Sequence, residues 1–480
     1  MGRACFVVQS KDMVRALVVL IVLAGIAYGV AYVVAGRGAP PRITIAKPDR
    51  PIGQAGTLEI TAEAPNARFT TLNVVLEQNG RTLPLFSLDK QTGTVSQPDP
   101  NRLQVSRPLG KQSVPELQSG SARIIVTAVR PSFLKLRQIT SVETKPFQVR
   151  LEPPRIAVLS THHYVNHGGS EMVVYRATPA DVASGVRVGS IEYPGFPAAG
   201  AGATGTTPDT KVAFFALLHD QDLRTPIAAF ARDEAGNEAK TGFIDNAFEK
   251  PFKKSRIELD DKFIDRVVPE IIEHSPELKM TAPAAGSPEM LAAFLRINGE
   301  LRKLNAGQIA AFSTKTSATR FWTQPFVQLG GSQVEASFAD HRTYLYKGKE
   351  VDQQTHLGFD LAVTARVPVI AANDGVVMNA NWLGIYGNCV VLDHGMGVQS
   401  LYGHLSSFDV GVGDKVMRGQ TIGRSGMTGL AGGDHLHFTM LVGGRMVNPV
   451  DWWDPHWIAD RVERKLKDAS ATSGSVTSVR

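Results

Sequence analysis

The feature that most constrains how this chain folds is an apolar segment near its N-terminus. Residues 16–36, ALVVLIVLAGIAYGVAYVVAG, contain no charged side chain. At a helical rise of ~1.5 Å per residue, a segment of this length spans about 30 Å, which is the thickness of a bilayer core. We therefore predict a transmembrane helix over residues 16–36.

The charges before this segment predict its orientation. Arg3, Lys11 and Arg15 precede the apolar run, and positive residues favour the cytoplasmic side of a membrane. Residues 1–15 are then a cytoplasmic N-terminus, and the rest of the chain is extracytoplasmic. A secretory signal peptide cleaved near Ala35 is the alternative, but its apolar core is usually shorter. We favour an uncleaved anchor.

Composition places the remainder among folded proteins. The chain has 480 residues, of which 43% are hydrophobic and 20% charged, so it has room for several domains and is not a disordered protein. Its two cysteines, Cys5 and Cys389, lie on opposite sides of the predicted span and form no disulfide framework. The net charge of +6 is modest, and no basic helix or finger indicates a nucleic-acid partner.

The region after the anchor has β patterns. LEITAEA (58–64) alternates apolar and polar residues, and LNVVLEQNGRTLPLF (72–86) is typical of two strands around an Asn-Gly turn. We predict two immunoglobulin-like β-sandwich modules over 42–152 and 153–250. We favour a role for them as spacers over a role in binding a protein partner or the wall.

The pattern becomes helical over residues 255–312. Apolar residues recur there at i, i+3 and i+4, which predicts a short helical connector. We expect this connector either to pack on the domain that follows it or to cover a cleft of that domain and keep the domain latent. The tail 469–480 is rich in Ser and Thr, and we predict that it is disordered.

Four histidines and an aspartate late in the chain predict its chemistry. His356 and Asp360 are four residues apart, so on a strand they would point to the same face; His435 and His437, two apart, would also share a face. His404 lies in another segment and reaches them only through the fold. Three of the five side chains are enough to hold zinc with one open position, which leaves two imidazoles for acid–base chemistry.

These residues carry a resemblance to a known family. The stretch from about Phe326 to Asp451, with HLGFD (356–360), LYGHLS (401–406) and DHLHF (434–438), resembles the LytM/lysostaphin-type zinc endopeptidases, which have the duplicated-hybrid-motif fold. The resemblance implies hydrolysis of peptide bonds in bacterial peptidoglycan. By this resemblance, the family's zinc ligands correspond to His356, Asp360 and His437. The family's two catalytic histidines correspond to His404 and His435.

The resemblance also implies roles and a location. His435 orients the water and accepts its proton, and His404 donates a hydrogen bond to the oxyanion; the sequence leaves these two roles exchangeable. The protein is then a single-pass protein of the bacterial cytoplasmic membrane, with its catalytic domain on the periplasmic or wall side. One departure is Ala339 in SFADHR, where family members often have glycine.

Three alternatives to this interpretation are open. The string VGVGDKVMRGQTIGRSG resembles biotin- or lipoyl-carrier repeats, but it has no lysine at an exposed tip. A catalytically silent regulator or adaptor of wall hydrolases would share the same fold, although all five site positions are kept. A secreted zinc peptidase acting on proteins is a more distant possibility. His394, in LDHGMG, is interpreted as structural.

The sequence therefore predicts a multidomain, mainly β protein that acts as a Zn²⁺-dependent endopeptidase on peptidoglycan peptide stems or cross-bridges. The predicted parts are, in order, a cytoplasmic N-terminus (1–15), a transmembrane helix (16–36), two β-sandwich modules (42–152 and 153–250), a helical connector (255–312), an antiparallel β catalytic domain (320–458) and a disordered tail (469–480).

Overall fold

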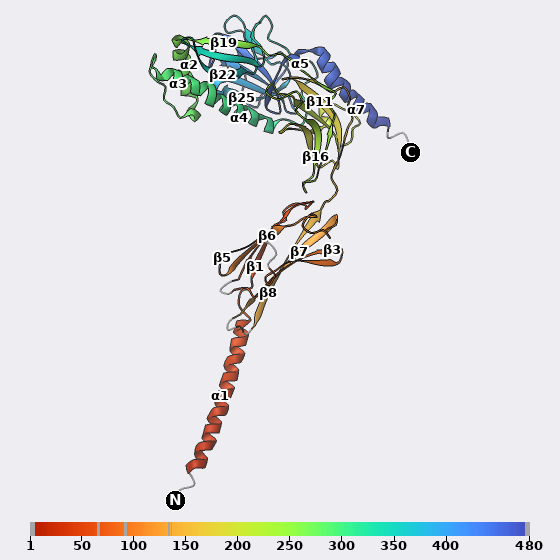
Figure 1. Ribbon diagram of the computed structural model, residues 1–480, viewed down its shortest axis with the longest axis vertical. Coiled ribbons are helices and arrows are strands. Elements are labelled where there is room, and N and C mark those ends of the chain that lie inside the picture. The colour runs from red at the N-terminus through yellow and green to blue at the C-terminus, as the bar shows by residue number, and fades with distance from the viewer. Residues whose placement is uncertain (1–4, 65–67, 91–93, 133–134, 136, 476–480) are drawn as a thin grey trace. The chain divides into compact units, whose positions relative to one another are not determined.

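A computed structural model describes the chain except residues 1–4, 65–67, 91–93, 133–134, 136 and 476–480 (Figure 1). The fold is mainly β, as predicted, with an N-terminal apolar helix and a C-terminal sheet domain. The chain divides into two compact units. The first contains residues 1–153 with 233–238, and the second contains residues 154–232 with 239–480.

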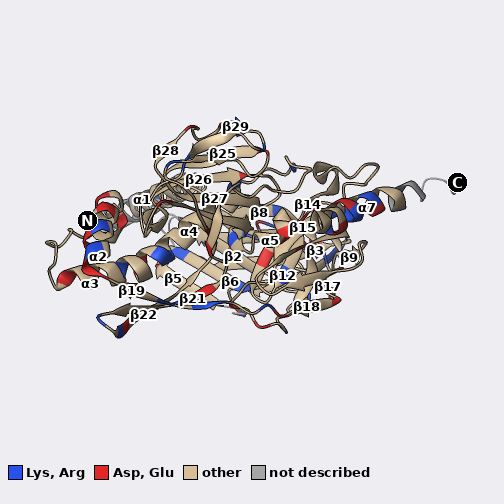
Figure 2. Cartoon of the chain, turned by 90° about the horizontal axis from the view of Figure 1, so that it is seen from above, with Lys and Arg blue, Asp and Glu red and all other residues tan. Residues whose placement is uncertain are grey.

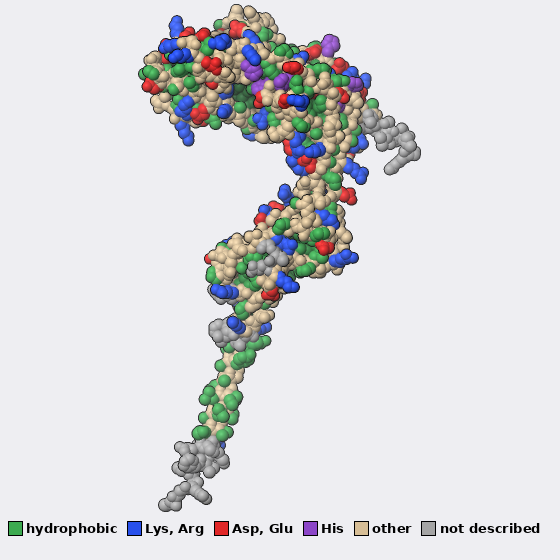
Figure 3. Space-filling model, viewed as in Figure 1, with side chains coloured by type: hydrophobic (Ala, Val, Ile, Leu, Met, Phe, Trp, Pro, Cys, Tyr) green, Lys and Arg blue, Asp and Glu red, His purple; other side chains and the backbone are tan. Residues whose placement is uncertain are grey.

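The N-terminal helix α1 runs from Cys5 to Ala35. It begins before the predicted start at Ala16, because the helix continues through the basic residues that precede the apolar run. Within it, Met13–Ala35 is long and apolar enough to cross a membrane, and apart from its last residue, Ala35, this stretch is not buried in the protein. Hydrophobic side chains cover its described surface (Figure 3). Length and composition alone do not separate a membrane anchor from a signal sequence.

The rest of the first unit is a pair of four-stranded sheets. Their orders are β1-β2-β6-β5 and β4-β3-β7-β8, and the apolar residues between them form one core around Leu58, Leu72 and Ile124. The predicted Asn-Gly hairpin is confirmed, since Asn79 and Gly80 both have positive φ between β3 and β4. The strands are β1 Arg42–Lys47, β2 Thr57–Glu63, β3 Thr71–Gln78, β4 Arg81–Ser87, β5 Thr94–Asp99, β6 Arg102–Pro108, β7 Gly120–Pro131 and β8 Gln138–Val149.

The second unit begins with another β region. Two four-stranded sheets, β14-β15-β11-β9 and β13-β12-β16-β17, accompany the short parallel pair β10-β18. Their apolar residues share a core with the C-terminal domain, around Phe214, Trp322 and Trp452. The strands are β9 Arg155–Val158, β10 Tyr164–Asn166, β11 Ser170–Thr178, β12 Ala183–Val188, β13 Ile191–Pro194, β14 Phe196–Pro197, β15 Thr210–Ala216, β16 Ile227–Arg232, β17 Glu238–Gly242 and β18 Asn246–Phe248.

The predicted helical connector begins with a strand instead. Strand β19, Lys254–Leu259, pairs in parallel with β21, Asp340–Tyr346, over six residues. Its two apolar residues, Ile257 and Leu259, are two apart, which is strand spacing, and the helical pattern begins only after them. Asp260 then caps the next helix by accepting a hydrogen bond from Phe263 N at 2.7 Å. The helices are α2 Asp261–His274, α3 Glu289–Arg296 and α4 Arg302–Phe312, with a π-helical turn, Ile297–Leu301, joining α3 to α4. They lie beside strands β22 and β25 (Figure 1).

The C-terminal domain is built on one large antiparallel sheet. Its strand order is β20-β23-β31-β27-β26-β25-β29, with β32 paired to β31. Every residue of the central strands β27 and β31 is buried. The strands are β20 Gln333–Ala336, β21 Asp340–Tyr346, β22 Lys349–His356, β23 Phe359–Ala362, β24 Pro368–Ile370, β25 Gly375–Trp382, β26 Asn388–Asp393, β27 Val398–Leu405, β28 Ser407–Phe408, β29 Lys415–Val416, β30 Thr421–Arg424, β31 His435–Val442 and β32 Arg445–Val447.

The C-terminal segment is helical where the sequence predicted disorder. Helices α5 Val450–Trp453 and α6 Pro455–Trp457 lead through a π-helical turn into α7, Arg464–Ser475. Lys465 anchors this helix because its buried ammonium donates to Glu171 Oε1 at 2.9 Å, and Ala469 is also buried. Helix α7 carries charges of both signs (Figure 2). Residues 476–480 of the predicted tail lie outside the described part of the chain.

Candidate metal centre

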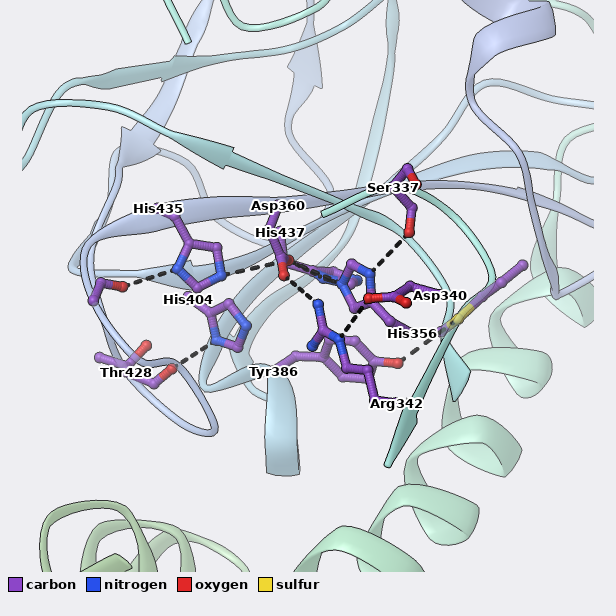
Figure 4. A network of polar contacts seen from close by, with 12 residues as sticks. Ser337, Asp340, Arg342, His356, Asp360, Tyr386, His404, Thr428, His435 and His437 are labelled. Carbon is purple, nitrogen blue, oxygen red and sulfur yellow. Dashed lines mark hydrogen bonds and ion pairs between the residues drawn. The ribbon is translucent and has the colours of Figure 1, made fainter. Parts of the chain in front are cut away.

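Neighbouring strands bring the five predicted residues together (Figure 4). Strand β31 carries His435 and His437 and lies between β23 and β27. His437 is paired with Asp360 on β23 and with Gly403, the residue before His404, on β27. The predicted common face of His435 and His437 follows from their two-residue spacing on one strand.

His356 reaches the group by a different route from the one predicted. It is the last residue of β22, whereas Asp360 belongs to β23, and Leu357 and Gly358 separate the two strands. The two side chains therefore converge through a break in the chain and not along one strand.

Three ligand atoms converge on a single point. Asp360 Oδ1 lies 2.9 Å from His356 Nε2 and 3.1 Å from His437 Nδ1, and the two nitrogens are 3.1 Å apart. The three residues form a group whose candidate ligand atoms all lie within 4.8 Å of one another.

The protonation of this group suits a cation. Although burial alone would raise the pKa of the Asp360 carboxyl, His356 and hydrogen bonds from the neighbouring imidazoles hold that pKa well below its ordinary value. Burial lowers the pKa of His437 to about 4. The site therefore contains an ionised carboxylate beside a neutral imidazole, and these are the forms of Asp and His that bind metal.

The donor set fits zinc. Two imidazole nitrogens and one carboxylate oxygen are the ligand types of a catalytic zinc site, which keeps a further position open. The Nδ1–H of His356 is directed at the carbonyl of Ser337, 3.3 Å away, so its Nε2 is free to bind. His356, Asp360 and His437 are thus the residues that would hold the metal.

Arg342 supports Asp360 from the other side and was not identified from the sequence. Its Nη2 donates to Asp360 Oδ2 at 3.0 Å, while its Nε lies 3.4 Å from Asp340 Oδ2. Such outer contacts orient a ligand and tune its basicity. The signal available was the two-residue spacing of Asp340 and Arg342 in ADHR, which puts both on one face of a strand.

His404 and His435 are anchored in the same way. The Nδ1–H of His404 donates to the carbonyl of Thr428 and that of His435 to the carbonyl of Gly433, both at 2.8 Å. Each ring therefore keeps its Nε2 available for chemistry. The Nε2 of His435 lies 3.5 Å from Asp360 Oδ1. The ring centroids of His404 and His435 are 4.8 Å apart.

The pKa values of these two histidines shift in opposite directions. Burial, with the neighbouring His435 and His437, lowers the pKa of His404 well below its ordinary value. Burial also acts to lower the pKa of His435, but the hydrogen bond and charge of Asp360 outweigh it, so that pKa is raised. A cation at the three ligands would oppose this effect of Asp360.

Two of the described residues with positive φ, Ala339 and His404, belong to the site or its adjoining loop, and L-residues rarely adopt this conformation. Ala339, where the family often has glycine, is buried with φ of +61°, and its N–H donates to the carbonyl of His356 at 2.7 Å. The loop therefore keeps the left-handed conformation that glycine would favour. His404 also has a positive φ, +63°, so the fold holds a catalytic candidate in a strained conformation.

A cleft of about 370 Å³ opens over the five residues. Its opposite wall comes from the segment predicted as the connector, including Leu259 of β19, Phe263 of α2 and Phe294 of α3. The cleft thus lies between the sheet that carries the ligands and the helices that precede it, within the second unit.

His394 lies away from this group. It is fully buried, with Nδ1 at 2.7 Å from the carbonyl of Asp374 and Nε2 at 2.7 Å from Ser400 Oγ. Both nitrogens are engaged inside the domain, as a structural residue requires.

Comparison with known proteins identifies this part of the chain. Residues 354–449 match Peptidase family M23. A DD-carboxypeptidase/endopeptidase, Mpg, of Neisseria meningitidis is 43% identical over 95 residues, which are 20% of this chain and 22% of that protein. The peptidoglycan DD-endopeptidase ShyA of Vibrio cholerae is 45% identical over 93 residues, 19% of this chain and 22% of that protein.

Other matches include a relative that is named for a different role. The murein hydrolase activator EnvC of Escherichia coli is 40% identical over 95 residues, 20% of this chain and 23% of that protein. Among solved structures, the catalytic domain of lysostaphin from Staphylococcus simulans is 26% identical and covers 30% of this chain and 96% of that one, with a TM-score of 0.20. The chain spans about a fifth of the length of these curated relatives. Its C-terminal region, residues 354–449, is a peptidase M23 domain.

Proposed function

We propose that this protein is a membrane-anchored, zinc-dependent endopeptidase that hydrolyses peptide cross-links of bacterial peptidoglycan. The observation that carries the proposal is the convergence of His356 Nε2, Asp360 Oδ1 and His437 Nδ1 at 2.9–3.1 Å, at the base of an open cleft. The peptidoglycan substrate is supported by the activities for which the relatives similar to this domain are named.

The three ligands hold the metal and two histidines work beside it. When bound, zinc acts as a Lewis acid that activates water near neutral pH and polarises a carbonyl. His435 accepts the proton of the attacking water through Nε2, because its Nδ1–H is committed to Gly433 O. Its position 3.5 Å from Asp360 Oδ1 puts it next to the ligand set.

His404 acts on the carbonyl oxygen of the scissile bond. Its Nδ1–H is committed to Thr428 O, so Nε2 donates a hydrogen bond only when the ring is protonated. Burial opposes that charge, and a developing oxyanion beside the ring favours it. The hydrogen bond is therefore strongest in the transition state, which is where it accelerates the reaction.

The anchor and the β modules complete the proposal. Helix α1 holds the protein in the membrane, with the catalytic domain on the periplasmic or wall side. The β modules act as spacers between the membrane and the enzyme.

A second function is supported by one relative. EnvC of Escherichia coli is named a murein hydrolase activator, so a non-enzymatic regulator with the same fold is the alternative. The five site residues are all present in this chain, which favours the enzyme.

Digestion of peptidoglycan separates the two functions. The full chain, purified in mild detergent, is incubated with sacculi and the released muropeptides are analysed by mass. An enzyme removes cross-linked species, and His437→Ala or a chelator abolishes the effect. A regulator leaves the sacculi intact alone but increases their digestion by an added wall hydrolase.

A further inference from the structure

The wall of the cleft opposite the metal ligands carries an arginine whose charge is not matched by a carboxylate. Arg302, the first residue of α4, lines the cleft together with His356, Asp360 and His437. It comes from the segment 255–312, for which we predicted only a helical connector that packs on the following domain or covers its cleft.

Two contacts hold the Arg302 guanidinium, and both are to a neutral group. Its Nε donates to the carbonyl of Asn298 at 3.1 Å, and its Nη2 donates to Asn298 Oδ1 at 2.7 Å. Among the described residues, no carboxylate forms an ion pair with it and Nη1 has no hydrogen-bond partner. By contrast, the other arginine of the cleft, Arg342, is occupied by Asp360 and Asp340.

Asn298 is itself fixed, so the orientation of Arg302 is built into the fold. Asn298 is fully buried, and its Nδ2 donates to Asp352 Oδ2 at 2.8 Å. This bond turns its Oδ1 toward Arg302. Asn298 lies in the π-helical turn Ile297–Leu301, and π-helical turns inside helices frequently accompany functional sites.

A second buried asparagine ties α4 to the metal site. Asn305 Oδ1 accepts a hydrogen bond from Ile385 N at 3.0 Å, and the neighbouring Tyr386 packs on His437 with ring centroids 5.3 Å apart. Arg302 thus projects from a helix that is locked to the loop beside the ligands. A guanidinium preorganised in this way binds a carboxylate with less loss of side-chain entropy.

We propose that Arg302 is a specificity-determining residue that binds a free carboxylate of the substrate close to the scissile bond. A cross-link made through one amino group of a diamino dicarboxylic acid leaves the carboxylate on the same carbon free. A cross-link through the side-chain amino group of lysine, or a glycine bridge, has no free carboxylate there. Arg302 therefore selects cross-links through a diamino dicarboxylic acid over glycine bridges. This inference rests on the proposed function of the same site.

The test compares two cross-linked peptides that differ only at this carboxylate. One peptide carries the free carboxylate and the other carries its carboxamide, and kcat and KM are measured with the full-length zinc-loaded protein in detergent. Wild type prefers the carboxylate. Because a hydrogen bond to a charged group is involved, Arg302→Gln lowers kcat/KM for that peptide by about tenfold to a hundredfold, mainly through KM.

Three comparisons make the result specific. Arg302→Gln leaves the carboxamide peptide unaffected, so the preference disappears. Arg302→Lys keeps the charge and recovers part of the preference. Lys303→Gln, at the exposed neighbouring position, behaves as wild type. An equal loss on both peptides, or no loss on either, overturns the proposal.

Binding separates this proposal from the proposed function. Calorimetry on metal-free protein measures the affinity of both peptides without cleavage. If wild type cleaves neither peptide but binds the carboxylate form more tightly, in a way that Arg302→Gln abolishes, the endopeptidase assignment fails and the carboxylate site stands. Equal binding of the two peptides by wild type refutes the carboxylate site.

Discussion

His437 and Asp360 face each other across strands β31 and β23, with His437 Nδ1 3.1 Å from Asp360 Oδ1. The contact depends on Gly358, because a Cβ at that position would lie 2.5 Å from Nε2 and Cε1 of the His437 ring. Atoms cannot approach so closely, so any side chain at 358 displaces the ring of His437, a proposed metal ligand.

Gly358→Ala is therefore expected to weaken metal binding while the domain stays folded. The displaced ring costs about tenfold to a hundredfold in zinc affinity, the range typical of disturbed ligand orientation. Competition with a zinc-binding dye measures it. Gly330→Ala is the matched control, since no atom lies within 4 Å of a Cβ there; equal affinities of the two variants would contradict the steric role of Gly358.

Arg342→Gln tests the support behind Asp360. The variant loses the 3.0 Å hydrogen bond to Asp360 Oδ2, and we expect zinc affinity to fall about tenfold to a hundredfold. Lys349→Gln, at an exposed position of the same hairpin, serves as the control. Unchanged affinity in Arg342→Gln would mean that Asp360 needs no second partner.

The strain at His404 predicts an unusual order of stabilities. At φ of +63°, glycine is free of the cost of about 1–2 kcal/mol that an L-residue incurs in the left-handed conformation. His404→Gly should therefore unfold at a higher temperature than His404→Ala, although both lack the imidazole. At the exposed Gln353 of strand β22, the same pair should show the opposite order, because glycine in a strand costs about 0.5–1 kcal/mol relative to alanine. The same order at both positions would contradict strain at His404.

Buried histidines predict how stability depends on pH. Burial lowers the pKa of His394 to about 4, whereas a histidine in the unfolded chain titrates near 6.5. Between these two pH values the native state binds fewer protons than the unfolded chain. The contribution of neutral His394 to the free energy of unfolding, about 3 kcal/mol, is therefore complete above pH ~6.5 and is lost as the pH falls toward 4.

Thermal unfolding at a series of pH values checks this assignment. His394→Gln should show a smaller fall in unfolding temperature between pH 6.5 and 4 than wild type. His456→Gln, at a side chain that is 95% exposed, should retain the wild-type slope. Identical slopes in wild type and His394→Gln would refute the role of His394.

Local patterns predicted local structure well. The Asn79–Gly80 turn follows from two residues that accept positive φ, and the shared face of His435 and His437 follows from strand geometry.

Long-range pairing accounts for what the sequence did not reveal. Residues 255–259, predicted as part of the helical connector, belong to β19, because β21 offers a parallel partner. Lys465 and Ala469 hold the tail as a helix through contacts with a segment almost 300 residues away. Arg342 and Arg302 reach the cleft in the same way, through pairings that no short motif encodes.

Zinc titration with cleavage as the readout tests the central claim most directly. Metal-free full-length protein is titrated with zinc while cleavage of cross-linked muropeptides is followed, in wild type and in His437→Ala. One zinc per chain should restore cleavage in wild type, and His437→Ala should neither bind it tightly nor cleave. Cleavage that persists without metal, or in His437→Ala, would contradict the account.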